Sequence, residues 1–286
     1  MDLFRIISLE TFIDLLHNKR ERYVRPATWK DTFEGYLFSK IYDKDEQRKI
    51  VEEIYYNVCD RKYEATINNM LNLEHAKWFV YGQCWSTHKE SDAMWRIYSY
   101  ENHSIQIQST KDKIENLFQK EKQINCKILP VEYDVNPDDD ITHLQILQLK
   151  KTQRMYEPYL HKRKAFEHES ETRVLIDDIR WHQKVDLASM GANWKIDEAV
   201  QNINDDKGIM DEIIKRLEKH MNQWIKDKMP KEYYVNDIDL ESYISSVVVN
   251  PFAEDWYVAL IKNLCEEYKI KCDGRSHLYE RKDKIS

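Results

Sequence analysis

Two acidic residues late in the central part of the chain combine residue types and spacing that could do chemistry. Glu169 and Glu171 belong to the run Glu169-Ser170-Glu171-Thr172-Arg173, which predicts a β-strand over 169–176. Side chains two residues apart in a strand lie on one face, about 7 Å apart. Two such carboxylates could stabilise a developing oxocarbenium cation, with one of them binding a ribose hydroxyl. The alternative is a solvated edge strand that carries paired charges.

A serine and two aromatic residues form a second candidate group. Ser86 ends a predicted strand, and the short helix that follows it carries Trp95 and Tyr98. These aromatic residues are three positions apart and therefore share a helix face, which could stack on a flat ring. In the alternative interpretation both aromatic residues belong to the core and Ser86 is a turn residue. Cys84 has no adjacent base, so a buried, unreactive thiol is expected there.

Arg5 and Trp29 form a third candidate group. Arg5 lies among apolar neighbours in the first predicted strand, where its guanidinium could bind a phosphate or a carboxylate. The alternative is an arginine on an edge strand, extended toward solvent and paired with Glu10 or Asp31. Trp29 follows a proline and either lines a binding pocket or packs from a capped turn into the core.

The elements that must position these residues mix strands and helices without regular alternation. Hydrophobic periodicity and capping residues predict strands over 3–7, 22–25, 77–85, 104–109, 126–133, 169–176, 244–249 and 270–279. The same signals predict helices over 9–18, 43–59, 63–73, 110–120, 141–161, 208–229 and 253–268. We therefore expect an α+β fold with mixed, mostly antiparallel sheets. The chain reads as one domain over 1–286, with a helical or variable insertion at 177–240.

Composition excludes several classes of protein. The 286 residues carry a formal net charge of −7, which disfavours nonspecific nucleic-acid binding. Only five glycines occur, and none are spaced as in a dinucleotide fingerprint or a P-loop. Five scattered cysteines predict neither a disulfide framework nor a structural zinc site. No apolar run approaches the length of a membrane helix, so we expect a cytoplasmic protein without a membrane partner.

Several short motifs follow one another along nearly the whole chain. They are Phe4-Arg5, Pro26-x-x-Trp29-x-Asp31-x-Phe33-Glu34, Cys84-Trp85-Ser86, Met94-Trp95-x-x-Tyr98, Glu169-x-Glu171-x-Arg173, Val249-Asn250-Pro251, Trp256 and Ser276-x-Leu278-Tyr279. In this order they resemble a bacterial domain-of-unknown-function family, number two-nine-seven-one. That family name implies no activity.

A more distant resemblance does imply an activity. A basic residue on an opening strand, a Ser-Thr strand and a Glu-x-Glu strand look like the layout of mono-ADP-ribosyltransferases of the Arg-Ser-Glu type. The resemblance implies that Arg5 contacts NAD, that Ser86 braces the site and that Glu171 is catalytic. It also implies that Glu169 orients the acceptor or a water molecule. That fold binds NAD as a substrate without a Rossmann fingerprint and without a metal.

The resemblance further implies that Trp95 or Tyr98 stacks on nicotinamide, and Trp29 is a further candidate for binding the cofactor. The partners would be NAD and an unknown macromolecular acceptor or cognate inhibitor, with nucleic acid not excluded as an acceptor. A role as a toxin or a phage-defence effector follows from the resemblance alone. A different hypothesis is a non-catalytic module in which Arg5, Trp29 and Trp95 form a pocket for a nucleotide or a partner's loop.

A metal-dependent nuclease is the third hypothesis. Asp138, Glu169 and Glu171 could together hold Mg²⁺ or Mn²⁺. Arg173 stands where such a site would carry a lysine, which weakens this interpretation. An ADP-ribosyltransferase-like enzyme should ignore a chelator, whereas a nuclease of this kind should lose its activity in one.

Overall fold

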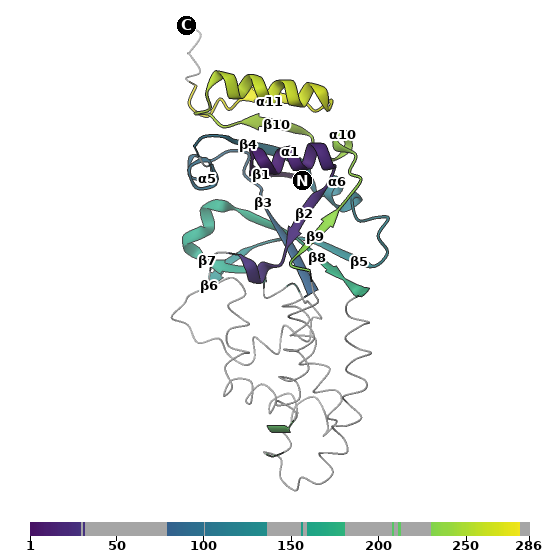
Figure 1. Cartoon of the computed structure of the whole chain (residues 1–286). Helices are drawn as coiled ribbons and strands as arrows, with labels where there is room; N and C mark the ends of the chain where they lie inside the picture. Colours follow the sequence, from purple (N-terminus) through teal and green to yellow (C-terminus); the bar gives the residue numbers. More distant parts are fainter. Residues whose placement is uncertain are drawn as a thin grey trace.

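The protein is a mixed α+β structure built on one large sheet, as expected from the sequence. The computed structural model describes residues 1–29, 31, 79–99, 101–135, 156, 159–180, 208, 211–212 and 230–280. A nine-stranded sheet and a two-stranded sheet are formed in this part of the chain (Figure 1). All pairings in the large sheet are antiparallel except that of β10 with β11. The mostly antiparallel architecture predicted from the sequence is therefore confirmed.

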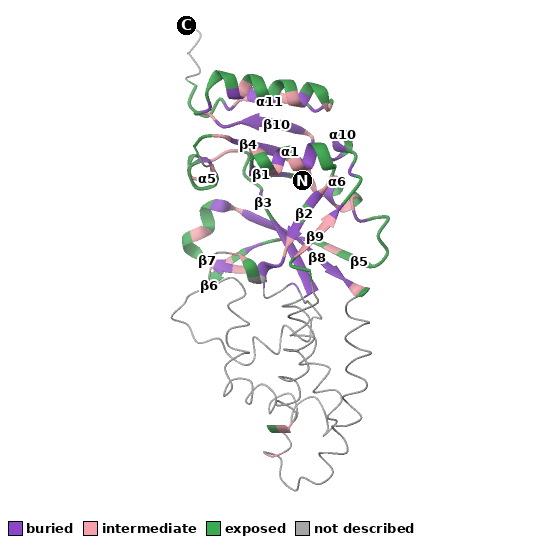
Figure 2. Ribbon diagram, in the orientation of Figure 1, coloured by how far each residue is buried: buried purple, intermediate pink, exposed green. Residues whose placement is uncertain are grey.

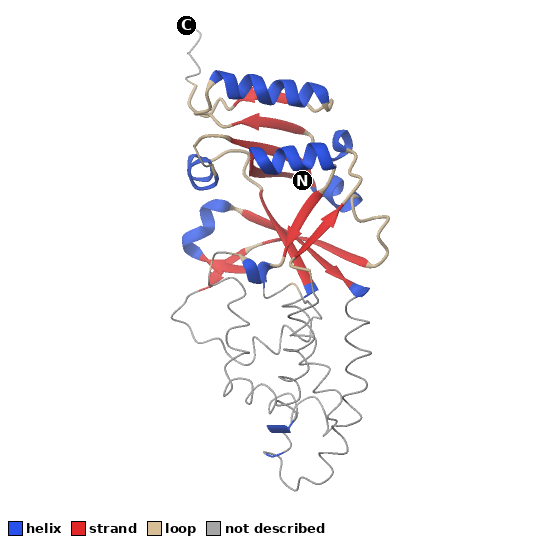
Figure 3. Cartoon of the chain, viewed as in Figure 1, coloured by secondary structure: helices blue, strands red, loops and turns tan. Residues whose placement is uncertain are grey.

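The strands of both sheets are β1 (Asp2–Ser8), β2 (Glu21–Val24), β3 (Val80–Ser86), β4 (Ser104–Thr110), β5 (Ile124–Pro130), β6 (Glu132–Val135), β7 (His161–Arg163), β8 (Glu171–Asp178), β9 (Glu232–Val235), β10 (Ser246–Val249) and β11 (Cys272–Arg275). The helices are α1 (Leu9–Asn18), α5 (Asp92–Tyr98), α6 (Lys111–Asn116), α10 (Leu240–Tyr243) and α11 (Asp255–Glu267), with 3₁₀ turns η1 (Pro26–Thr28) and η3 (Lys164–Glu169). Figure 3 shows how these helices surround the strands.

Strand β3 joins two parts of the large sheet. The path runs β11-β10-β4-β1-β3-β2-β9, and β8 pairs with β3 on one edge and with β5 on the other. Along one edge β3 pairs with β8 over its whole length, from Val80 to Ser86. Along its other edge β3 meets β1 only at Ser86 and β2 only at Gly82. The sheet therefore opens between β1 and β2, and both strands remain anchored to β3.

Helix α1 shows how the sequence determines a local element. The Ser8 hydroxyl accepts a hydrogen bond from the Thr11 amide at 3.3 Å, which caps the N-terminus. Lys19 adopts a left-handed conformation with φ 46° and ends the helix. Phe12, Leu15 and Leu16 recur at helical spacing and are buried against the sheet. The predicted bounds of this helix, 9–18, match the structure.

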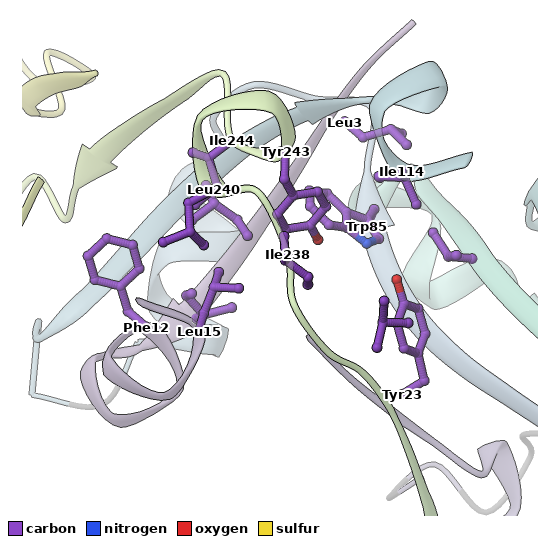
Figure 4. Close-up of a cluster of buried hydrophobic side chains, with 14 of the residues drawn as sticks. Leu3, Phe12, Leu15, Tyr23, Trp85, Ile114, Ile238, Leu240, Tyr243 and Ile244 are labelled. Atoms are coloured by element: carbon purple, nitrogen blue, oxygen red, sulfur yellow. The ribbon is translucent and has the colours of Figure 1, made fainter. Parts of the chain in front are cut away.

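The core lies between the large sheet and the helices α1, α6, α10 and α11, which all contribute buried side chains to it. Figure 4 shows side chains from both ends of the chain in one cluster, including Leu3, Phe12, Trp85 and Tyr243. Figure 2 shows β3, β8 and β10 mostly in the colour for buried residues; β8 and β10 are buried at every position and β3 at every position except Cys84. Strand β8 is buried at all eight positions although it carries several charged side chains. Charges at such positions need partners within the protein.

Some predicted boundaries differ from the structure. The last predicted strand, 270–279, is shorter, because β11 ends at Arg275. The described ends of the segment 177–240 belong to the main sheet: β8 runs to Asp178, and β9 pairs with β2. The helices predicted over 43–59 and 63–73, and most of those over 141–161 and 208–229, lie outside the described residues.

Candidate functional site

A pocket opens where β1 meets β3, beside α5 and the start of β8. Its walls combine apolar side chains with two carboxylates. The lining residues are Phe4, Arg5, Ile6, Cys84, Trp85, Ser86, His88, Ser91, Met94, Tyr98, Gln106, Glu169 and Glu171. Five of the seven residues that the sequence singled out for binding or catalysis are in this set: Arg5, Ser86, Tyr98, Glu169 and Glu171. A mostly apolar pocket with a few fixed polar groups is typical of a small-molecule site.

Strand pairing places two of these positions, Ser86 and Glu171, in one row with Phe4. Ser86 on β3 pairs with Phe4 on β1, next to Arg5, and on its other side with Glu171 on β8. Neighbouring strands lie about 4.8 Å apart, so residues far apart in the sequence meet at one wall of the pocket. The sequence could list these residues, but only the antiparallel register of three strands brings them together.

Glu171 is held by several donors. Its side chain is 4% exposed and accepts hydrogen bonds from Arg173 Nε at 2.8 Å and from Arg173 Nη2 at 3.2 Å. Lys162 Nζ donates to the same carboxylate at 3.1 Å. The backbone amide of Glu171 donates to the Tyr133 hydroxyl at 2.7 Å. These contacts fix the orientation of the carboxylate at the pocket wall.

The surroundings of Glu171 keep it ionised. Burial alone would raise its pKa, but the Arg173 guanidinium, the Lys162 ammonium and the Cys84 thiol lower the pKa to about 2. The carboxylate is therefore negatively charged throughout the physiological pH range. With Arg173 fully buried, its charge and that of Glu171 compensate each other inside the protein.

Glu169 reaches the same pocket by a route that the sequence did not predict. The strand expected to begin at 169 begins at Glu171, and Glu169 is the last residue of η3. Ser170 has a left-handed conformation with φ 43°, which reverses the chain and turns the Glu169 side chain back to Glu171. The Ser86 hydroxyl donates to the Glu169 carbonyl at 2.8 Å and stabilises this turn. The two carboxylates therefore do not lie on one strand.

Lys162 on β7 is a functional candidate that sequence reasoning missed. Its Nζ lies 2.5 Å from Glu169 Oε2 and 3.1 Å from Glu171 Oε2, and it sits 4.7 Å from the centre of the Phe166 ring. Burial would lower the pKa of this ammonium, but the two carboxylates raise it well above its usual range. The only local signal was a lysine seven residues before a glutamate, which has no meaning without the turn of η3.

Arg5 has a partner that the sequence did not indicate. β1 pairs with both β3 and β4, so it is an interior strand rather than an edge strand. Arg5 Nη1 donates to Glu21 Oε2 at 2.9 Å, and neither Glu10 nor Asp31 takes that place. The guanidinium has five N–H donors, and with 15% of its side chain exposed it also lines the pocket.

The aromatic residues divide between pocket and core. Tyr98 lines the pocket, and its hydroxyl donates to Glu169 Oε1 at 3.0 Å, so burial and this carboxylate raise the Tyr98 pKa. Trp95 is 1% exposed and is absent from the pocket lining, so Trp95 belongs to the core, as in the alternative interpretation, and only Tyr98 lines the pocket. Met94, four residues before Tyr98, is its neighbour in the lining.

Trp29 also lies outside the pocket lining. Its ring stacks over the fully buried Arg173 guanidinium at 4.6 Å. A Cβ on Gly82 would approach the Trp29 ring to 2.9 Å, so the glycine makes room for it. Trp29 supports the residue that holds Glu171 rather than contacting a pocket ligand.

Cys84 is exposed in the pocket, where the sequence predicted a buried thiol. It alternates with the buried Gln83 and Trp85 along β3 and therefore faces the opposite side of the sheet. Its thiol donates a hydrogen bond to Glu171. The thiol thus belongs to the polar group around that carboxylate.

The metal-nuclease hypothesis receives little support from these contacts. Asp138 lies outside the described residues, and the oxygens of Glu169 and Glu171 accept hydrogen bonds from two cations. A divalent cation would compete with Lys162 and Arg173 for the same oxygens. Within the described part of the chain, the one grouping of metal-ligand types is exposed Glu132 and Asp134 with His161, which is paired with Asp134 at 3.0 Å.

Among the described residues, no helix is both long and apolar enough to cross a membrane. Comparison with curated proteins and with solved structures finds no match to this chain. A family model does match it, across a segment that includes α5, β4, β5, β7 and the first half of β8. The resemblance drawn from the sequence motifs is thereby confirmed: residues 94–174 match the family described as Protein of unknown function (DUF2971).

Proposed function

We propose that the pocket binds NAD and that the protein cleaves the bond between nicotinamide and ribose. The observation that carries the proposal is that Arg5, Ser86 and Glu171, from three adjacent strands, line one pocket. This is the order of residues that the distant resemblance to Arg-Ser-Glu mono-ADP-ribosyltransferases implies. The ionised state of Glu171 and the aromatic wall of the pocket support the same chemistry.

Each side chain has a role in this proposal. The nicotinamide ring, a cation in NAD, packs against Tyr98 and the apolar wall. Arg5 uses donors other than its Glu21-bound Nη1 to contact a phosphate. Glu171 accepts a hydrogen bond from a ribose hydroxyl, and Glu169 orients the nucleophile.

The bond-breaking step is a heterolysis. The C–N glycosidic bond breaks, its electron pair moves to the nicotinamide nitrogen, and neutral nicotinamide leaves. The ribose carbon becomes an oxocarbenium cation, which water or a nucleophile of a macromolecular acceptor attacks with loss of a proton. Because Lys162 and Arg173 compensate both carboxylates, Glu171 contributes mainly through a fixed hydrogen bond that strengthens as the ribose gains positive charge.

The deciding experiment measures nicotinamide release from NAD by wild type and Glu171→Gln, with and without EDTA. Removing one such interaction typically costs about 10²–10³-fold in rate. We expect a loss of that size in Glu171→Gln and no effect of EDTA. Asp178→Asn is the matched control: Asp178 is a buried carboxylate on the same strand, bound by Arg180 at 2.5 Å, and it is not in the pocket lining.

Retained activity in Glu171→Gln, or an equal loss in Asp178→Asn, would contradict the proposal. Activity on nucleic acid that EDTA abolishes would favour the metal-dependent nuclease instead. If nicotinamide is not released by wild type but NAD raises its melting temperature, the pocket is a binding module rather than a catalytic site. To assign a role as a toxin or a defence effector, the macromolecule that accepts ADP-ribose would have to be identified.

A further inference from the structure

Exposed apolar side chains gather on and around the outer face of α11. Nine large apolar side chains are exposed in the described part of the protein, and five of them are Phe252, Trp256, Leu260, Leu278 and Tyr279. Trp256 and Leu260 are four residues apart in α11, so they share a helix face. Figure 2 shows the outward side of α11 mainly in the colour for exposed residues. Among the described elements, none covers this apolar face.

Trp256 is held in position on this face, although it is 54% exposed. Its indole N–H donates a hydrogen bond to the Glu254 carboxylate. Its ring packs edge-on against His103, with the ring centres 5.2 Å apart, and against Tyr257 at 5.6 Å. A large aromatic side chain that is already ordered loses little conformational entropy when a partner binds it. Tryptophan in such a position is a common anchor of protein–protein interfaces.

A second pair of aromatic rings extends the apolar surface beyond the N-terminus of α11. The rings of Phe252 and Tyr279 lie 4.8 Å apart, and the Arg96 guanidinium lies over the Phe252 ring at 5.5 Å. Asp92 accepts hydrogen bonds from the Tyr279 hydroxyl and from Arg96 Nε. Because this cation and this carboxylate already compensate each other, they favour neither a strongly acidic nor a strongly basic partner.

Two residues of opposite charge flank the apolar face on the side of α11 that lies against β11. Asp255 is 97% exposed and pairs with Arg275 of β11 at 2.5 Å. Lys262 is exposed, and a Cβ on Gly274 of β11 would lie 3.4 Å from its Cε. None of the ion pairs between described residues includes Lys262. Asp255 and Lys262 are seven residues apart, close to two helical turns, and therefore lie along one side of the helix.

We propose that this face binds a second copy of the chain, with the two α11 helices antiparallel about a twofold axis. The pair Asp255 and Lys262 and the pair Trp256 and Leu260 have centres only about 0.75 Å apart along the helix. One axis therefore brings Lys262 to Asp255 of the second copy, and Trp256 to Leu260 of the second copy. Each contact occurs twice. A twofold interface requires this self-complementarity, in which one surface supplies both members of each contact.

The expected interface is small. Helix α11 has 13 residues and is about 20 Å long. A single helix of this length covers less than the about 800 Å² that each partner contributes to an interface of standard size. We therefore expect a dimer that exchanges with monomer at micromolar concentrations. Because none of the residues on this face lines the pocket, the inference is independent of the proposed NAD chemistry.

Sedimentation velocity of the full chain over a concentration series tests the proposal. We expect the mass to rise from monomer toward dimer with concentration, and Trp256→Ala to raise the dissociation constant at least tenfold. Lys262→Glu should also weaken the dimer, because it places two carboxylates opposite each other at both charged contacts. Lys111→Glu is the matched control: Lys111 is also an exposed lysine, but it lies on α6 and pairs with Glu115. This control should dimerise like wild type.

A mixing experiment distinguishes a second copy from any other occupant of this face. Lys262→Glu and Asp255→Lys each place like charges opposite each other in their own dimers. In a heterodimer of the two variants, both charged contacts join opposite charges. We expect an equimolar mixture to dimerise more strongly than either variant alone. Circular dichroism checks that both variants are folded, since Asp255→Lys also removes the partner of Arg275.

Cross-linking through introduced cysteines does not depend on the charge variants. Ala259 is exposed next to the proposed axis, so Ala259→Cys should give a disulfide-linked dimer on mild oxidation, above the level that wild type gives. Glu267→Cys is the control on the same helix. Glu267 is also exposed, but in the antiparallel dimer it lies about 26 Å from Glu267 of the second copy, too far for a disulfide.

Four outcomes would overturn the proposal. They are a monomeric wild type at every concentration, a dimer that Trp256→Ala leaves unchanged, no gain on mixing the two folded charge variants, and equal cross-linking at positions 259 and 267. A monomeric wild type would leave the face to a different protein, and equal cross-linking would indicate that the two helices are not antiparallel.

Discussion

Glu21 and Glu171 are both buried carboxylates, but Glu21 lies in the core and Glu171 lies at the wall of the pocket. Glu21, 3% exposed, accepts hydrogen bonds from Arg5 at 2.9 Å, Gln83 at 2.7 Å and Tyr243 at 3.2 Å, all within the core. Glu171 is equally well bound but lies at the wall of a pocket. The cations also differ. Lys162 bridges two carboxylates, those of Glu169 and Glu171, whereas Arg5 donates to the carboxylate of Glu21.

The two glutamates differ in what their cationic partners keep when the carboxylate loses its charge. Loss of charge at Glu171 leaves Lys162 bound to Glu169, and Arg173 Nη1 still donates to the Tyr159 carbonyl at 2.5 Å. Loss of charge at Glu21 leaves the Arg5 guanidinium without its carboxylate in a largely enclosed place. The pocket group therefore tolerates change better than the core group, which is expected of a site that must respond to a ligand.

The largest effect is expected for Glu21→Gln. It keeps the shape of the side chain but removes the negative charge opposite Arg5, and breaking a buried pair in this way costs about 3–5 kcal/mol. Chemical denaturation should show that loss in the free energy of unfolding. Nicotinamide release should also fall, because Arg5 lines the pocket. If the variant is as stable as wild type, the Arg5 guanidinium is solvated without Glu21. The proposed difference in stability between changes at Glu21 and at Glu171 would then be contradicted.

A smaller effect is expected in the pH dependence of stability, through Glu171. The folded-state pKa of Glu171 is lowered from 4.5 to about 2. A lowered folded-state pKa stabilises the protein above the unfolded value, and this contribution is lost as pH falls from about 4.5 to 2. The shift corresponds to about 3 kcal/mol of stability at neutral pH. Unfolding free energies measured from pH 7 to pH 2 should decline less steeply in Glu171→Gln than in wild type and Asp178→Asn.

The smallest effects should distinguish two buried tyrosines of the core. Tyr243→Phe removes a hydrogen bond to the charged Glu21 and should cost about 1.5–3 kcal/mol. The Tyr23 hydroxyl is buried with no hydrogen-bond partner among the described residues, so Tyr23→Phe should change stability by less than about 0.5 kcal/mol. Thermal melts of both variants provide the comparison. Equal losses would indicate that a water molecule satisfies Tyr23 and that both hydroxyls belong to the polar group.

Local elements and several site residues could be predicted from the sequence because their signals are local. The cap at Ser8 and the apolar stripe of α1 lie within one helix, and their predicted bounds match the structure. Arg5, Ser86 and Glu171 were chosen by residue type and motif order, and all three line the pocket. Trp95 was misplaced because a three-residue spacing predicts a shared face without saying which face meets the core.

By itself, the sequence determined the alternation of strands and helices, the mixed α+β class, the absence of the common nucleotide-binding fingerprints and the family that matches residues 94–174. Tertiary structure decided which charges meet. The partner of Arg5 lies 16 residues away across two strands, and the turn at Ser170 places Glu169 beside Lys162. Ion-pair energies depend on distances of a few ångströms, and those distances arise from strand register and chain reversal rather than from spacing along the chain.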